Sequence, residues 1–158
     1  MKLGLLLCAL ACLGAARAGT VTTPELCRLM YAARLRVVVY APTVQSARFG
    51  ECLRKAVVNY RRNVIVLTVP YFNQDGDSLV NALALAGVKV YEAQVDSLKS
   101  VVLIDGYTFT GEGIGMDDDP EITLLSENAT PAYVGDFKRI LKTARFVSRF
   151  VVDERTKR

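Results

Sequence analysis

Short apolar runs alternate with amphipathic segments along most of the chain. Residues 36–40 and 63–69 are largely apolar and rich in β-branched side chains, which is typical of parallel strands covered on both faces of a sheet. In residues 46–62 the apolar side chains recur at intervals of three and four, which predicts an amphipathic helix between these strands. The pattern therefore predicts a strand–helix–strand unit.

Capping residues predict two further helices. Thr22 provides a hydroxyl cap and a proline follows two residues later, so a helix is expected at about residues 24–33. Asp77 or Ser78 can cap a second helix that ends at Gly87, because glycine fits the left-handed position past a helix end.

More strands and one long helix complete the predicted order. The strands are expected at residues 88–91, 101–104, 107–110 and 121–125. The turn pair Asp105–Gly106 predicts that the second and third of these strands form a hairpin. The last and longest helix is expected from Thr130 to about Val152. Together the elements predict an α/β fold with a mixed β-sheet flanked by helices on both faces.

The first 18 residues have the organisation of an export signal. A charged residue precedes the apolar residues 3–14, and the small-x-small pattern Ala16–Ala18 follows them. The apolar run is shorter than the roughly 20 residues that a membrane-spanning helix needs. We therefore expect a signal peptide at residues 1–18, a single domain at residues 19–158, and a secreted or periplasmic protein. The alternative is a lipid anchor through Cys12.

Loss of that segment would change both the charge and the cysteine content. It holds Lys2 and Arg17 of the 20 basic residues and none of the 16 acidic ones, so the remaining chain has a net charge of +2. So small a total cannot attract nucleic acid or anionic lipid by itself, and the placement of the charges must decide. Cys27 and Cys52 remain; they can pair in an oxidising compartment or persist as two buried thiols, and both alternatives stay open.

The chain contains no histidine. Histidine is the usual side chain for proton transfer near neutral pH and a common nucleophile toward phosphorus. Its absence excludes Ser-His-Asp triads, Cys-His dyads and zinc sites that use imidazole ligands.

Several short strings in this order of elements are similar to one known family. They are the strand that ends at Pro70–Phe72, the segment 86–90 between a helix and a strand, the apolar strand that ends at Asp105–Gly106, and Thr110–Gly111 after the hairpin. From about Arg36 to Phe150 the chain resembles the phospholipase D superfamily, and most of all its short, exported, single-motif bacterial endonucleases. The resemblance implies a phospholipase D-like sheet.

The signature of that family, His-x-Lys-x-x-x-x-Asp followed by Gly-Ser-x-Asn, is degenerate here. With Asp105 in the aspartate position, Leu98 falls in the histidine position, Ser100 in the lysine position and Glu112 in the serine position. The resemblance implies that the histidine attacks phosphorus and the lysine neutralises phosphoryl oxygens. Leu98 cannot attack, Ser100 carries no charge, and Glu112 would repel a phosphate. Only Asp105 matches, and we favour its simpler interpretation as a turn residue.

Two loops are further candidates. The acidic residues Asp117, Asp118, Asp119 and Glu121 could bind a divalent cation, but their spacing does not match a calcium loop, so a solvated acidic loop is expected. Residues 110–115 are rich in glycine, but no helix follows them, so we expect a flexible turn rather than a phosphate-binding loop. No metal site and no cofactor is predicted.

The last predicted helix carries a basic face. Its members recur at intervals of four, three and four: Lys138, Lys142, Arg145 and Arg149. The face could contact the phosphates of nucleic acid or of lipid headgroups. A cationic outer face is also typical of an ordinary surface helix, and no aromatic residues accompany it.

These observations favour a binding or scaffolding protein: an exported, catalytically inactive relative of phospholipase D nucleases, with nucleic acid or anionic lipid as its partner. The first alternative is a phosphodiesterase with an altered, metal-assisted site that uses Ser100 or Asp105. The second is a partner-binding protein that forms a homodimer through the face where family members pair their motifs.

Overall fold

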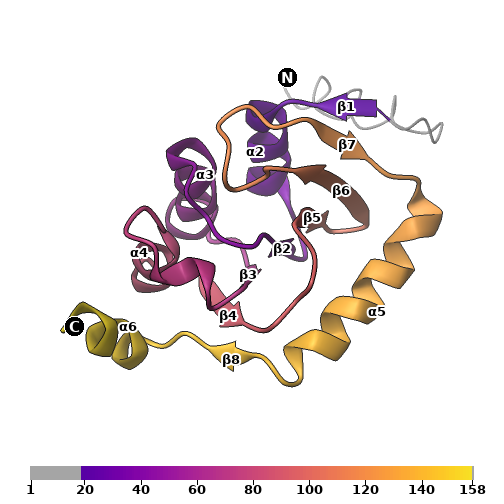
Figure 1. Cartoon of the computed structure of the whole chain (residues 1–158). Coiled ribbons are helices and arrows are strands. Elements are labelled where there is room, and N and C mark those ends of the chain that lie inside the picture. The colour runs from indigo at the N-terminus through magenta and orange to yellow at the C-terminus, as the bar shows by residue number, and fades with distance from the viewer. Residues whose placement is uncertain (1–18, 158) are drawn as a thin grey trace.

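A mixed sheet of eight strands runs through the centre of the molecule (Figure 1). The computed structural model describes residues 19–157, so the predicted signal peptide and the alternative anchor at Cys12 lie outside the described residues. The strand order is β1-β7-β6-β5-β2-β3-β4-β8. Within the described residues, no helix is long and apolar enough to cross a membrane.

The strands are β1 (Gly19–Val21), β2 (Val37–Tyr40), β3 (Val64–Thr68), β4 (Lys89–Glu92), β5 (Lys99–Ile104), β6 (Tyr107–Glu112), β7 (Ile122–Leu124) and β8 (Arg145–Phe146). The helices are α2 (Thr23–Ala32), α3 (Ala47–Val58), α4 (Val80–Leu85), α5 (Thr130–Leu141) and α6 (Arg149–Thr156), with short 3-10 turns η1 (Phe72–Gln74) and η2 (Glu127–Ala129). The predicted α/β class and mixed sheet are confirmed.

The three strands β2, β3 and β4 are parallel. Val37 lies opposite Val64, and Ile65 lies opposite Lys89, so all three strands begin at the same edge of the sheet. We call this edge the amino edge and the opposite one the carboxyl edge. The β5–β6 hairpin pairs antiparallel with β2, and Asp105–Gly106 forms its turn, as predicted.

Both faces of the sheet are covered. Val37 and Val39 of β2 belong to the larger apolar cluster, which includes buried residues of α2, α3, α4 and α6. Val38 and Tyr40, which alternate with them, belong to a second cluster that Phe137 of α5 joins. Figure 1 shows α5 on the opposite side of the sheet from α2, α3 and α4. The fully apolar sequence of β2 follows from this two-sided cover.

Local capping explains the helix starts only in part. The Thr22 side chain and Glu25 form a reciprocal capping box at α2, and the Ser46 hydroxyl accepts a hydrogen bond from the Phe49 N–H at α3. Gly87 has a φ of 96°, the left-handed conformation expected past α4. Leu79 rather than Asp77 or Ser78 occupies the N-cap position of α4 and makes no side-chain cap bond, but the Ser78 hydroxyl accepts a hydrogen bond from the Val80 N–H at 3.4 Å.

The predicted long C-terminal helix is wrong. It is divided into α5, β8 and α6, because residues 143–148 leave the helical path and pair with the free edge of β4. The Val147 N–H donates to the Val90 carbonyl, and Ser148 caps the new helix α6. An edge strand presents unpaired backbone groups, and satisfying them outweighs the weak preference of these residues for continuing a helix.

Cys27 of α2 and Cys52 of α3 form a disulfide, which decides between the two alternatives left open by the sequence. Their Cα atoms are 5.5 Å apart, and the bond joins two helices that pack side by side on the sheet. The disulfide therefore anchors α2 to its neighbour α3.

The strand β1, which the pattern did not predict, pairs antiparallel with β7 just before α2 begins.

We expect the double variant Cys27→Ser/Cys52→Ser to lose about 3 kcal/mol of unfolding free energy, because the bond closes a loop of 25 residues in the unfolded chain. Urea denaturation followed by circular dichroism measures the loss. A reducing agent should lower the stability of the wild type to the same level and leave the double variant unchanged. Equal stability of the oxidised and reduced wild type would contradict this expectation.

Candidate functional site

The four positions of the degenerate motif lie at two different ends of the β5–β6 hairpin. Leu98 directly precedes β5, Ser100 is its second residue, and Glu112 is the last residue of β6. Lys99 lies opposite Glu112 in the antiparallel register. Asp105 is in the turn at the far end, and five residues of extended strand span roughly 17 Å. The structure therefore brings Leu98, Ser100 and Glu112 together at the carboxyl edge and separates Asp105 from them.

Ser100 is fully buried, and its hydroxyl is already bonded. The Oγ donates to the carbonyl oxygen of Ile114 at 2.9 Å. The Ser100 carbonyl in turn accepts a hydrogen bond from the Thr110 hydroxyl at 3.1 Å. A serine held in this way is not accessible to a substrate from the surface.

Residues 113–119, which we call the cover loop, lie over Ser100. Ile114 is fully buried in the main core, and the Gly115 carbonyl accepts hydrogen bonds from the N–H groups of Gln45 and Ser46 at 2.7 and 2.9 Å. Gly115 has a φ of 94°, and a Cβ there would lie 3.0 Å from the Thr43 carbonyl oxygen. Glycine is required at this close approach. The expectation of a flexible turn at 110–115 is therefore wrong, since this segment is bonded to the β2–α3 connection.

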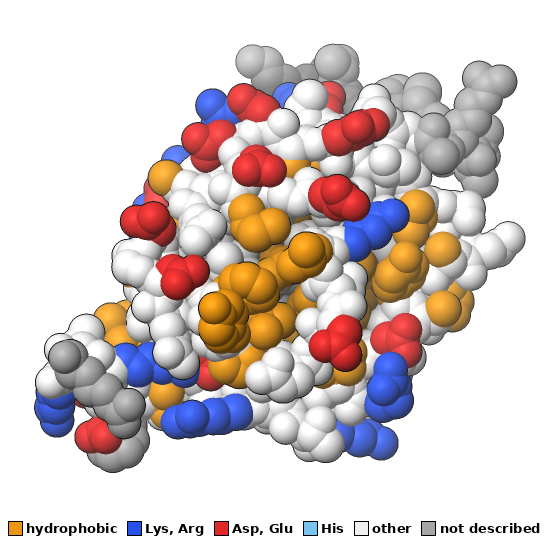
Figure 2. Space-filling model, viewed as in Figure 1, with side chains coloured by type: hydrophobic (Ala, Val, Ile, Leu, Met, Phe, Trp, Pro, Cys, Tyr) orange, Lys and Arg blue, Asp and Glu red, His pale blue; other side chains and the backbone are white. Residues whose placement is uncertain are grey.

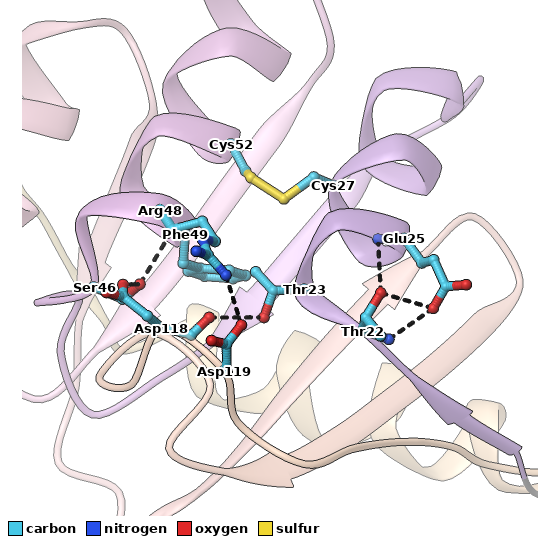
Figure 3. A network of polar contacts seen from close by, with 10 residues as sticks. All are labelled: Thr22, Thr23, Glu25, Cys27, Ser46, Arg48, Phe49, Cys52, Asp118 and Asp119. Carbon is cyan, nitrogen blue, oxygen red and sulfur yellow. Dashed lines mark hydrogen bonds and ion pairs between the residues drawn. A yellow bond between two sulfur atoms is a disulfide. The ribbon is translucent and has the colours of Figure 1, made fainter.

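The acidic residues hold the other end of the cover loop against the start of α3 (Figure 3). The Asp118 carboxylate accepts a hydrogen bond from the Ser46 hydroxyl at 2.6 Å, and its backbone carbonyl accepts one from Thr23 at 3.2 Å. Asp119 forms an ion pair of 2.6 Å with Arg48. These side chains remain exposed, as a solvated loop predicts, but they also tie α2, α3 and the loop together. Within residues 19–157 no cluster of three or more candidate metal ligands is present.

Leu98, in the position that the resemblance assigns to histidine, is exposed to solvent. Its side chain is 65% exposed, and Tyr71, which follows β3, is 74% exposed. Figure 2 shows hydrophobic side chains gathered in the middle of one face, with charged side chains of both signs around them. Beside Glu112, a shallow pocket of about 300 Å³ also holds Lys99 and Glu121. A second acid there makes this pocket a poor phosphate site.

The predicted basic face does not exist as one helical surface. Lys138 lies on α5, Lys142 is the C-cap of that helix, Arg145 is in β8, and Arg149 is the first residue of α6. All four side chains are exposed. Their common spacing of three and four residues has no meaning across the strand break, because only a continuous helix places such residues on one face.

Arg145 lines a larger pocket that sequence reasoning missed. The pocket has a volume of about 710 Å³ and lies at the carboxyl edge, beside β4, η1, α4 and α6. On its wall Glu92 is almost fully buried, and both of its oxygens accept hydrogen bonds from Arg155 at 2.8 and 2.7 Å. Asn73 also donates to Glu92 at 2.8 Å. Glu92, an acid directly after the predicted strand at residues 88–91, was the one signal of this pocket in the sequence.

The ion pair between Glu92 and Arg155 on the wall of this pocket stabilises the fold. A buried carboxylate without a partner is strongly destabilising, and the bidentate Arg155 contact compensates Glu92. The contact also fastens α6, the last helix, to β4. The Oδ1 atom of Asn73 is buried and has no hydrogen-bond partner among the described residues.

No protein-family model matches the sequence, and no curated protein is significantly similar to it. Solved structures do match. One is Nuc from Salmonella typhimurium, a phospholipase D family member, with a TM-score of 0.66, 11% identity, and coverage of 84% of this chain and 98% of that one. NucT from Helicobacter pylori has the same TM-score and identity, with coverage of 83% and 99%. The chain has a phospholipase D-like fold.

A third similar structure is TrmBL2, an archaeal chromatin protein described with a novel mode of DNA binding. The match has a TM-score of 0.59 and 13% identity, and it covers 90% of this chain and 59% of TrmBL2. At such identities the likeness establishes the fold alone. The resemblance inferred from the order of elements is therefore confirmed, and the phospholipase D-like domain must be judged on its own residues.

Asp105, the matching residue of the signature, is fully engaged with the backbone. Its carboxylate accepts hydrogen bonds from the N–H groups of Arg34, Leu35 and Arg36 at 2.9, 2.8 and 3.1 Å. Its φ of 52° is the left-handed turn conformation that aspartate tolerates. Burial by itself would raise the pKa of Asp105, but the three backbone donors outweigh it, so the pKa lies below its ordinary value.

Replacing Asp105 should therefore destabilise the phospholipase D-like domain in a pH-dependent way. We expect Asp105→Asn, which keeps the size and turn preference, to cost about 2 kcal/mol at pH 7, because the loss of charge weakens three hydrogen bonds. Since the folded-state pKa is lowered, the stabilisation is present above the unfolded-state pKa of about 3.9 and is lost as the pH falls through the folded-state value.

Urea denaturation of both proteins between pH 7 and pH 3 measures this difference. Asp136→Asn, which removes an exposed acid paired with Arg139, provides the control and should change stability little at any pH. A difference for Asp105→Asn that stayed constant down to pH 3 would show that the carboxylate charge has no part in these hydrogen bonds.

Proposed function

We propose that the chain is an exported, catalytically inactive phospholipase D-like domain that binds phosphate-rich polyanions. The observation that carries the proposal is the state of Ser100: it stands in the lysine position, it is fully buried, and its hydroxyl is bonded to Ile114 in the cover loop. A substrate phosphate could reach it only after the cover loop moved. Export is supported by the Cys27–Cys52 disulfide, since such bonds persist in oxidising compartments.

The chemistry of the motif positions supports the same proposal. The resemblance implies a histidine nucleophile and a cationic clamp, yet the chain has no histidine and presents Leu98 and Glu112 at the corresponding positions. An aliphatic side chain offers no lone pair for attack on phosphorus. Glu112 adds a negative charge where the transition state requires positive groups. Removing a nucleophile from a mechanism of this type typically costs several powers of ten in rate.

Binding is supported by the exposed cations at the end of the chain. Lys142, Arg145 and Arg149 form no ion pair with an acid of residues 19–157, so their charges are available to a partner. The cations come from three consecutive elements, and Arg145 opens onto the 710 Å³ pocket. TrmBL2, one of the three similar structures described above, is described as DNA-binding, which makes nucleic acid the first ligand to test.

We expect the protein not to hydrolyse bis(p-nitrophenyl) phosphate or nick plasmid DNA above the level of its Ser100→Ala variant. The absorbance of released nitrophenolate and the conversion of supercoiled plasmid are the measurements, each made without metal and with added calcium, magnesium or manganese. Turnover without metal that Ser100→Ala abolishes would overturn the proposal of inactivity. Turnover only with a metal would support the altered, metal-assisted phosphodiesterase instead.

We expect the double variant Lys142→Ala/Arg145→Ala to weaken binding to fluorescent DNA and to anionic vesicles, measured by anisotropy and by sedimentation. The slope of log K against log salt should fall by about 1 for each phosphate that the variant no longer binds. Arg54→Ala, which removes a cation already paired with Glu51, is the matched control and should bind like the wild type. Unchanged binding by the double variant would exclude these cations as the polyanion surface.

A further inference from the structure

Five basic residues gather at the amino edge of the sheet, opposite the degenerate motif. We call them the amino-edge cluster: Arg34, Arg36, Arg61, Arg62 and Lys89. They precede or begin the three parallel strands β2, β3 and β4, which are adjacent in the sheet and begin at the same edge. Residues more than 50 positions apart in the sequence are thus brought to neighbouring strand starts, about 4.8 Å apart from one strand to the next.

Hydrogen bonds link the segments that carry this cluster. Lys89 donates to the Asn63 side chain at 2.9 Å, and the Asn63 carbonyl accepts the Val37 N–H at 2.9 Å, directly beside Arg36. The Arg62 Nε donates to the Tyr31 carbonyl at the end of α2 at 2.7 Å. The cations therefore lie at the adjacent starts of β2, β3 and β4, which these bonds link to one another.

The side chains of the amino-edge cluster are not held in ion pairs within the described residues. None of its five members forms an ion pair there, whereas Arg48, Arg54, Arg139 and Arg155 all do. Asp105 also lies at this edge. Its oxygens accept hydrogen bonds from three backbone N–H groups, but it keeps its negative charge, which interacts with Arg34. The five cations still outnumber this carboxylate. A surface of this kind has a positive potential that attracts phosphates.

An aromatic pair lies beside the cations. The rings of Tyr31 and Tyr60 are stacked with centroids 4.5 Å apart and planes only 7° from parallel. Tyr60 is 46% exposed, and Arg62 donates to the backbone carbonyl of Tyr31, the other member of the pair. A nucleobase that left its own stack could extend this one, because base–aromatic stacking is favourable for every base. Cations and aromatics together are the recognition elements of single-stranded nucleic acid.

The backbone of Arg61 is the second unusual feature of this edge. Its φ is 54°, the left-handed region that glycine adopts most readily, and its N–H bonds back to the Val57 carbonyl at the end of α3. The side chain is exposed and makes no ion pair within residues 19–157. The chain thus carries a cation where the fold alone would favour glycine, which is a pattern found where function outweighs local stability.

We propose that the amino edge binds single-stranded nucleic acid, with its phosphates on the amino-edge cluster and a base stacked on Tyr60. This site goes beyond the proposed function, because it lies at the opposite edge of the sheet from Ser100, Arg145 and the cover loop. A lipid surface is the competing ligand. It would require an exposed apolar side chain among the cations, and Leu35, which is 76% exposed between Arg34 and Arg36, is that side chain.

Fluorescence anisotropy with a labelled 20-nucleotide oligo-dT tests the proposal. We expect Arg36→Ala/Lys89→Ala to bind at least tenfold more weakly at 0.1 M salt and to lower the salt slope by about 1.4, or 0.7 for each single-strand phosphate bound. Tyr60→Leu should weaken binding about tenfold without changing that slope, because stacking releases no counterions. These two responses separate the cationic and the aromatic contributions.

The variant Arg61→Gly tests whether weaker oligonucleotide binding is caused by misfolding. It should match or exceed the wild type in melting temperature while binding the oligonucleotide more weakly, since it relieves a left-handed conformation and removes a cation. Arg48→Ala/Arg54→Ala removes two cations that are already paired with acids and should leave the affinity unchanged. Arg61→Gly with unaltered binding would argue against any contact at this position.

Other outcomes distinguish this inference from the proposed function. Loss of oligonucleotide binding in Lys142→Ala/Arg145→Ala, but not in Arg36→Ala/Lys89→Ala, would overturn the amino-edge site and leave the carboxyl-edge proposal intact. The reverse result would support the amino edge alone. If the wild type bound anionic vesicles but no oligonucleotide, and Leu35→Ser abolished that binding, the ligand would be a membrane surface and the inference would be wrong.

Discussion

The structure depends on the burial of its central strands on both faces. Alternate residues of β2 contribute to the two apolar clusters, one beneath α2, α3, α4 and α6 and the other beneath α5. Burying apolar area on both sides provides most of the free energy that orders the sheet. It also leaves no room for polar chemistry on either face. Ligand-binding groups are confined to the two edges where strands end and loops begin. Open α/β sheets generally bind ligands at the carboxyl edge of the two.

The two edges have developed differently. At the carboxyl edge the cover loop buries Ser100, acids tie the loop to α3, and the buried Glu92–Arg155 pair fastens the last helix. Most polar groups there satisfy one another, as buried groups must. At the amino edge the only carboxylate contact serves the backbone of residues 34–36, and the neighbouring cations remain without acidic partners in the part of the chain described. The two edges of this phospholipase D-like fold therefore differ in how far their polar groups are paired with one another.

Particular residues explain which predictions held. Thr22, the amphipathic spacing in 46–62 and the Asp105–Gly106 turn are local signals, and each was read correctly from the sequence. The helix predicted to Val152 failed because residues 143–148 satisfy the free edge of β4, and that edge is invisible in a linear pattern. The predicted basic face is wrong for the same reason, because its four residues lie on or beside three separate elements. Ser100 directly precedes the predicted strand at residues 101–104, whereas β5 includes it. Its burial could not be foreseen, since it depends on a loop 13 or more residues away that folds back over it.

The sequence by itself determined the alternation of strands and helices, the caps, and the absence of an imidazole, because these depend on side-chain type and on neighbours within a few positions. Only the tertiary structure decided that the two cysteines pair, that Ser100 is covered, and that cations from three strand starts come together at one edge of the sheet. Each of these results joins residues far apart in the chain. Such contacts are fixed by strand order, register and packing, and no local pattern of residues records them.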